Sequence, residues 1–179
     1  DHMDRYLSMG DYTLAKARIF RGAKRAVLPR HQDNLEQIST TAETITFGLD
    51  QPANAKDYGV TDGKKSRWLA QGSERLIKVK SLSLLGMHNV ENVLAAFALV
   101  EFLKLPLKPL VKAVKLFQGL PHRMETVASG AGVRWVNDSK ATNIGATLAA
   151  IEGLAPTVSQ SNKLILIAGG DGKGADFSQ

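Results

Sequence analysis

The sequence predicts a mixed α/β protein, and three observations favour this class. Short segments with the alternating apolar pattern of strands recur between residues 26 and 79. A long apolar segment with helical spacing follows at residues 85–105. Beyond residue 132, a strand pattern, a helical pattern and an unbroken apolar run succeed one another, which is the order of a strand–helix–strand unit.

The composition is that of a folded globular protein with one large or two small domains. Of the 179 residues, 44% are hydrophobic and 22% are charged, which disfavours disorder. The net charge of +6 favours anionic partners, but only 6% of the residues are aromatic, so we expect no nucleic-acid partner. The chain has no cysteine for disulfides or thiolate metal sites, and no run approaches the roughly 18 apolar residues of a membrane span. We therefore expect a cytoplasmic protein without membrane segments.

The first half of the chain predicts a helix followed by a small sheet. Apolar residues at helical spacing indicate a helix over residues 11–23. Lys16 lies on its apolar side, where a lysine ordinarily lays its methylene chain along apolar surface. Two short strand patterns lie between residues 26 and 47, and residues 58–63 have the composition of a turn. The alternating segments around Gln71-Gly72-Ser73 predict an antiparallel hairpin.

Two helices and a hinge are predicted next. The apolar positions of residues 85–105 form the broad face of a long helix, and residues 108–117 have an apolar stripe of their own. Gly119-Leu120-Pro121 then interrupts the pattern in the manner of an interdomain hinge. We therefore predict one domain over residues 1–119 and a second over residues 120–179.

The second domain has the pattern of a strand–helix–strand unit. Residues 125–136 predict a hairpin, residues 142–154 a helix, and residues 163–168 a strand that is covered on both faces. In a right-handed crossover both parallel strands end at the same edge of the sheet. We therefore expect the loops at residues 137–143 and 169–173 to meet there.

These two loops carry the residues best suited to binding an anion. Lys140 and Lys173 would lie at neighbouring strand ends, the edge at which open α/β sheets bind ligands. Glycines beside Lys173 would let backbone N–H groups approach the same ligand. The alternative, which the sequence leaves open, is a pair of solvated lysines in polar loops.

Further candidate residues lie near the long helix, the hinge and the amino end. Asn89 and Asn92 are three residues apart and share one helix face, where two carboxamides can pair with a purine edge, although Asn89 could instead cap the helix. Arg123 follows the hinge and could reach a phosphate or form a structural salt bridge. His2, which has acidic neighbours, could bind a divalent cation.

Five motifs occur in an order and at separations that resemble the Mur ligase family of peptidoglycan synthesis. The resemblance covers the whole chain, and its most specific part is the loop at residues 138–143. The motifs are Asp1-His2-Met3-Asp4-Arg5-Tyr6, Gly86-Met87-His88-Asn89 with Asn92, Gly119-Leu120-Pro121-His122-Arg123, Asn137-Asp138-Ser139-Lys140-Ala141-Thr142-Asn143 and Gly169-Gly170-Asp171-Gly172-Lys173.

The resemblance implies the C-terminal part of a P-loop-type ATPase domain with a small antiparallel meander, followed by the start of a Rossmann-like α/β domain. It also implies a ligase, monomeric when full length, that uses ATP and Mg²⁺. Such a ligase phosphorylates the carboxylate of UDP-N-acetylmuramoyl-L-alanine and then joins it to D-glutamate.

The resemblance further assigns roles to particular residues. His2 would be a magnesium ligand, and Lys16 would be the lysine that is carbamylated in this family to support a second magnesium. Asn89 and Asn92 would hold the adenine, Arg123 the ATP phosphates and Asp138 the ribose. The substrate carboxylates and the incoming D-glutamate would be oriented by Lys140, Thr142 and Lys173.

The chain also departs from the family pattern. It has no P-loop, because Tyr58 and Lys65 occupy the positions around Gly63-Lys64 that require Gly and Ser or Thr. We expect a piece of a longer enzyme that has no turnover alone. The alternatives are a sister Mur ligase, a folylpolyglutamate synthase, and a non-catalytic module that binds nucleotides or anions. Ser139-Lys140-Ala141-Thr142 argues against the first two.

Overall fold

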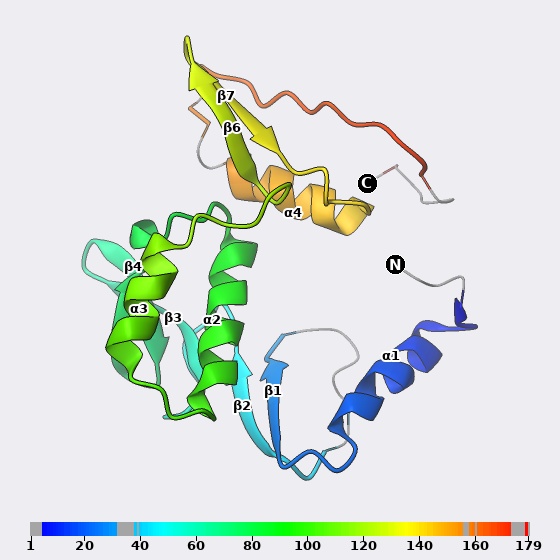
Figure 1. The fold of residues 1–179 in the computed structure, drawn as a ribbon, viewed down its shortest axis with the longest axis vertical. Coiled ribbons are helices and arrows are strands. Elements are labelled where there is room, and N and C mark those ends of the chain that lie inside the picture. Colours follow the sequence, from blue (N-terminus) through cyan, green and yellow to red (C-terminus); the bar gives the residue numbers. More distant parts are fainter. Residues whose placement is uncertain are drawn as a thin grey trace.

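The computed structural model describes residues 5–31, 38, 40–155, 158–159, 161–172 and 178. The first part of these residues forms a five-stranded sheet in the order β1-β2-β3-β4-β5 (Figure 1). β1, β2 and β3 are parallel neighbours, whereas β3, β4 and β5 form an antiparallel meander. The strands span Arg25–Pro29 (β1), Glu43–Phe47 (β2), Tyr58–Gly63 (β3), Ser66–Gln71 (β4) and Glu74–Lys78 (β5).

Two helices cover one face of this sheet and close the hydrophobic core (Figure 1). α2 (Met87–Glu101) lies against the parallel strands, and α3 (Leu107–Leu116) packs its apolar side on the same core. The rings of Tyr58 and Phe97 stack across the sheet–helix interface with centroids 6.2 Å apart. The largest fully buried side chains are Tyr58, Phe97, Ile45, Leu69, Ile77 and Leu94.

Most of the predicted elements of the first half are confirmed. The two strands before residue 47, the hairpin and both helices are present. α2 ends at Glu101, several residues earlier than predicted, because Lys104 adopts a left-handed conformation with φ of 53° and turns the chain before Pro106.

The prediction of a turn at residues 58–63 is wrong, since this segment is the central strand β3. Gly59 suggested a turn, but here it permits a close backbone approach. A Cβ at Gly59 would overlap the carbonyl oxygen of Asp50 and would lie 2.8 Å from the nitrogen of Pro52. The N–H of Val60 donates to that same carbonyl at 2.8 Å, so the segment at residues 50–52 is seated directly on β3.

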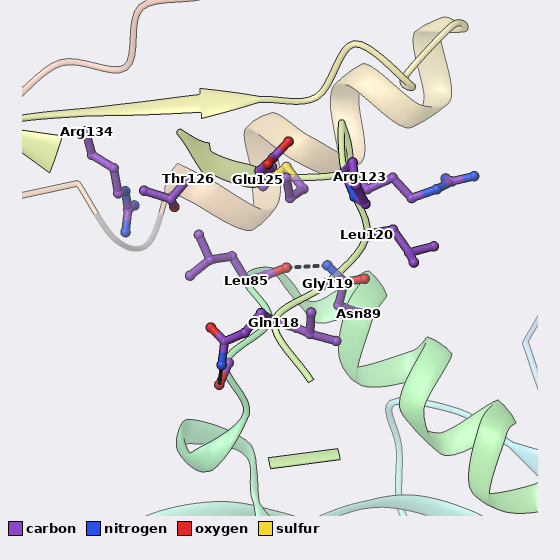
Figure 2. Close-up of a pocket in the computed structure, with 13 residues that line it drawn as sticks. Leu85, Asn89, Gln118, Gly119, Leu120, Arg123, Glu125, Thr126 and Arg134 are labelled. Atoms are coloured by element: carbon purple, nitrogen blue, oxygen red, sulfur yellow. Dashed lines mark hydrogen bonds between the residues drawn. The ribbon is translucent and has the colours of Figure 1, made fainter. Parts of the chain in front are cut away.

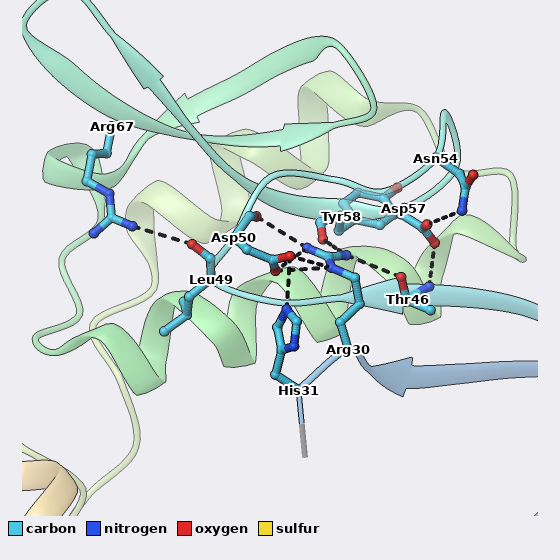
Figure 3. A network of polar contacts seen from close by, with 9 residues as sticks. All are labelled: Arg30, His31, Thr46, Leu49, Asp50, Asn54, Asp57, Tyr58 and Arg67. Atoms are coloured by element: carbon cyan, nitrogen blue, oxygen red, sulfur yellow. Dashed lines mark hydrogen bonds and ion pairs between the residues drawn. The ribbon is translucent and has the colours of Figure 1, made fainter. Parts of the chain in front are cut away.

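Arg30, which follows β1, ties together the ends of three strands (Figure 3). Its guanidinium donates to the Asp50 carboxylate at 2.7 Å, to the Thr46 hydroxyl at 3.2 Å and to the Tyr58 carbonyl at 2.7 Å. The hydrogen bond from Arg30 is the main reason that the pKa of Asp50 falls from 3.8 to about 2. Because its donors are used within the sheet, Arg30 is a structural residue.

The second part of the chain contains a hairpin and a helix. β6 (Glu125–Gly130) and β7 (Val133–Asn137) form a two-stranded antiparallel sheet, and α4 (Ile144–Leu154) follows. The Asn143 side chain caps α4 by accepting a hydrogen bond from the N–H of Ala146 at 2.8 Å. The predicted hairpin and helix are thus confirmed, and both lie above the start of α2 in Figure 1.

The strand predicted over residues 163–168 is not formed. This segment runs along the outside of the hairpin without pairing (Figure 1), and Ile165 and Ile167 are 79% and 81% exposed. A strand is stabilised by hydrogen bonds to a neighbouring strand, and among the described residues β7 pairs with β6 alone. The predicted strand–helix–strand unit is therefore not assembled here.

The amino-terminal helix lies apart from these elements (Figure 1). α1 (Met9–Ala17) and the short 3₁₀ helix η2 (Arg18–Phe20) replace the single helix predicted over residues 11–23, and none of their residues is buried. The short 3₁₀ helix η4 (Val79–Ser81) follows β5. Within the described ranges, no helix combines the length and apolarity needed to cross a membrane.

Candidate functional site

A pocket of about 420 Å³ opens between the start of α2 and the hairpin β6–β7 (Figure 2). Three parts of the chain line it, namely residues 83–89, the connecting segment at residues 118–121, and the hairpin with the residues just before it (123–126 and 134). Its volume lies in the range of roughly 300–1,000 Å³ that is usual for small-molecule sites. The polar side chains of the lining are Ser83, Asn89, Gln118, Arg123, Glu125, Thr126 and Arg134.

Asn89 presents its carboxamide to the pocket from the first turn of α2. Its Nδ2 donates to the carbonyl of Leu85 at 2.7 Å (Figure 2), and its Oδ1 accepts a hydrogen bond from Asn92 at 3.3 Å. The residue that caps α2 is Gly86, so the alternative of Asn89 as helix cap is wrong. The two asparagines are in contact, as their spacing indicated, but only Asn89 lines the pocket.

The loop that carries Arg123 has an unusual backbone. His122 and Met124, on either side of it, adopt left-handed conformations with φ of 63° and 49°. Such conformations cost about 1 to 2 kcal/mol for residues other than glycine. Two hydrogen bonds hold them, from the His122 N–H to Glu125 Oε2 at 2.9 Å and from the Met124 N–H to Asp138 Oδ1 at 3.0 Å. The loop is therefore fixed by its surroundings.

The Arg123 side chain extends outward from this loop at the rim of the pocket (Figure 2). In the described part of the chain its guanidinium has no carboxylate partner, so the structure does not support the alternative of a structural salt bridge. The nearby acids Glu125 and Asp138 accept hydrogen bonds from backbone N–H groups instead. An exposed guanidinium at a pocket rim is suited to binding an anion.

The loop between β7 and α4 lies against the Arg123 loop. The N–H of Lys140 donates to the carbonyl of His122 at 3.1 Å, and the side chains of Lys140 and Thr142 are exposed. Asp138 is half-buried, and its Oδ1 supports the backbone of Met124. The structure thus brings the predicted residues Asp138, Lys140 and Arg123 into one region.

Two glycines allow α4 to approach the start of α2. A Cβ on Gly153 would lie 3.0 Å from the Cα of Gly86, which has φ of 87°. Only residues without side chains permit this backbone contact. Through this contact, α4 packs against the start of α2, which also lines the pocket.

Of the remaining predicted residues, only Lys16 is described, and it lies on α1, apart from this site (Figure 1). Lys16 is exposed on α1, where its ammonium lies 5.4 Å from the centroid of the Tyr12 ring. His2 and Lys173 lie outside the described residues. Among the residues that are described, no group of three or more His, Cys, Asp or Glu side chains is arranged to hold a metal ion.

Five polar residues of the pocket lining were missed by the sequence analysis, namely Ser83, Gln118, Glu125, Thr126 and Arg134. Arg134 carried a usable signal, because it alternates with the apolar Val133 and Trp135 and so lies on the other face of β7. For Glu125 and Gln118 the sequence contains no such signal. The Gln118 side chain donates to the Ser83 hydroxyl at 3.3 Å across 35 residues of sequence, a contact that no local pattern reveals.

Comparison with known families identifies the class of this protein. A family model described as the Mur ligase middle domain matches residues 1–100. The chain belongs to the Mur ligase family.

The curated relatives that match this chain share the name of one ligase. Proteins called UDP-N-acetylmuramoylalanine--D-glutamate ligase from Pseudomonas aeruginosa, Hahella chejuensis and Nitrosomonas eutropha are 48%, 47% and 44% identical to this chain. Each match covers 99% of the chain but only 37% to 40% of the relative. The chain thus spans less than half the length of these proteins.

Solved structures of the same family share the fold. MurF from Acinetobacter baumannii matches 86% of this chain and 35% of its own with a TM-score of 0.68. The MurC ligase from Thermotoga maritima, named UDP-N-acetylmuramate-alanine ligase, matches 87% of this chain and 36% of its own with a TM-score of 0.61. Both are 21% identical to the chain, so the likeness confirms the mixed α/β fold class alone.

Proposed function

We propose that the complete protein containing this chain is an ATP-dependent ligase of peptidoglycan synthesis. It forms the amide bond between UDP-N-acetylmuramoyl-L-alanine and D-glutamate. The observation that carries this proposal is the identity of 44% to 48%, over 99% of the chain, to relatives with that ligase name. We further propose that the protein is cytoplasmic and monomeric.

The proposal divides the chain between two binding tasks. Residues 1–119 belong to the ATP-binding domain, residues 120–179 belong to the domain that receives D-glutamate, and the pocket between them takes the nucleotide. Asn89 and Asn92 face the adenine in this assignment. The bonds of Asn89 to Leu85 and Asn92 leave one N–H and one lone pair free for a base, since a carboxamide has two of each.

Two bond exchanges make up the proposed reaction. A carboxylate oxygen of the UDP sugar attacks the γ-phosphorus of ATP and ADP leaves, which gives an acyl phosphate. The amine of D-glutamate then attacks the acyl carbon, and inorganic phosphate leaves. Negative charge spreads over the transferred group, so fixed cations lower the barrier. We assign Arg123 and Asp138 to the phosphates and ribose of ATP, and Lys140, Thr142 and Lys173 to the carboxylates.

We also propose that the enzyme uses magnesium. The ligands that the family resemblance implies for it are His2 and carbamylated Lys16. When bound, Mg²⁺ would neutralise charge on the ATP phosphates. Of the two proposed ligands, Lys16 lies on α1 and His2 lies outside the described residues. Carbamylation of Lys16 would join its amine nitrogen to CO₂ with loss of a proton.

Phosphate release by the complete protein tests this function. We expect release from ATP only when UDP-N-acetylmuramoyl-L-alanine and D-glutamate are both present, and no release from the 179 residues alone. Preference for a different amino acid would favour a sister ligase. Nucleotide binding without any turnover would favour the non-catalytic module.

A further inference from the structure

The residues on both sides of Arg123 need support from outside the loop. Left-handed conformations at His122 and Met124 persist only where the surroundings impose them. Two carboxylates provide this support by accepting the N–H groups of these residues, Glu125 for His122 and Asp138 for Met124. Asp138 already has a role in the proposed function, whereas Glu125 has none.

We propose that Glu125 is a positioning residue, whose hold on the His122 backbone directs Arg123 toward the phosphates of the nucleotide. The inference rests on the proposed function, because that function assigns Arg123 to these phosphates. Glu125 itself does not touch the reacting atoms in this account. It acts through the conformation of the loop.

Glu125 is well anchored for this task. It is the first residue of β6 and stands opposite Asn137 of β7 in the ladder. Asn137 also holds His122, since its Nδ2 lies 2.9 Å from the Nδ1 of the His122 ring. The Lys140 N–H binds the His122 carbonyl at 3.1 Å. His122 is therefore held at its backbone nitrogen by the start of β6, and at its ring and its carbonyl by residues 137–140.

Glu125 does not occupy the Arg123 guanidinium, which therefore remains available to bind a ligand. An ion pair between these two side chains would neutralise the guanidinium, but among the described residues Glu125 forms none with Arg123, and its Oε2 accepts the His122 N–H instead. Within the described residues Arg123 has no other acid at salt-bridge distance. What the loop requires of residue 125 is a hydrogen-bond acceptor, and the amide oxygen of glutamine can accept the same bond.

Calorimetric binding of a non-hydrolysable ATP analogue to the complete protein tests the proposal. Glu125→Ala is expected to weaken binding roughly tenfold, the usual effect of losing a hydrogen bond to a charged group. Glu125→Gln is expected to recover most of that affinity. Glu152→Ala, which removes an exposed acid on α4, is the matched control and is expected to bind like the wild type.

A double-mutant cycle shows whether Glu125 acts through Arg123. In an Arg123→Ala background, Glu125→Ala should cause no further loss of affinity. Independent, additive losses would overturn the proposal, and so would wild-type affinity in Glu125→Ala. If Glu125→Ala does not fold, Asn137→Ala replaces it, with a smaller loss expected in the same cycle. A wild-type protein that binds no nucleotide would contradict the proposed function instead.

Discussion

Replacement of Lys140 by alanine in the complete protein is expected to lower kcat by about 10²–10³-fold and to leave KM for ATP nearly unchanged. Losses of this size follow from removing one group that stabilises charge in a transition state. The Lys140 side chain is exposed, while its backbone N–H is bonded to the carbonyl of His122. Truncation of the side chain therefore removes a charge but keeps the backbone hydrogen bond that holds the loop. Steady-state kinetics, with each substrate varied in turn, measures the effect.

The control for this substitution is Lys112→Ala on the exposed side of α3. It removes the same charge from a residue that does not line the pocket, and it is expected to leave kcat unchanged. An undiminished rate in Lys140→Ala would show that Lys140 is a bystander. Equal losses in both variants would point to net charge rather than to a local role.

Gly59→Val is expected to lower the free energy of unfolding of the sheet domain by about 3 kcal/mol or more. The new side chain has no room, because the backbone of residues 50–52 lies directly on β3 and the Arg30 guanidinium is also in contact range. The neighbours are backbone atoms and a bonded arginine, which cannot move aside without breaking the network of Figure 3. Thermal unfolding of the complete protein measures the loss.

Gly130→Val provides the matched comparison. It introduces the same side chain at the end of β6, where a Cβ would meet nothing within 4 Å. We expect its unfolding temperature to stay close to that of the wild type. If both variants unfolded at the same temperature, the close approach at Gly59 would not matter for stability.

The sequence predicts those elements whose burial is visible in their own residues. α2 repeats apolar residues at helical spacing, and the β4–β5 hairpin alternates on either side of Gly72, so both were found. β3 was missed because Gly59 and Gly63 suggest a turn, whereas the strand is created by pairing with β2 and β4. Residues 163–168 show the opposite case. Their sequence has the pattern of a strand, but among the described residues they have no neighbouring strand to pair with and so form none.

The site was predictable to a similar extent. The spacing of Asn89 and Asn92 indicated their contact, and the position of Arg123 after the hinge indicated a place at the junction of two parts. The role of Glu125 depends on the left-handed backbone of His122, which no sequence pattern encodes. The assignments of His2, Lys16 and Lys173 depend on family resemblance alone, and they stay predictions.

The proposed ligation is tested most directly by following one oxygen atom. When the alanyl carboxylate of the UDP sugar carries heavy oxygen, each inorganic phosphate released by the complete protein is expected to contain one labelled oxygen. This follows because the oxygen that attacks the γ-phosphorus leaves with the phosphate when D-glutamate attacks the acyl carbon. Mass spectrometry of the phosphate measures the transfer. Amide product accompanied by unlabelled phosphate would contradict the acyl-phosphate route, and phosphate released without amide product would contradict the ligase itself.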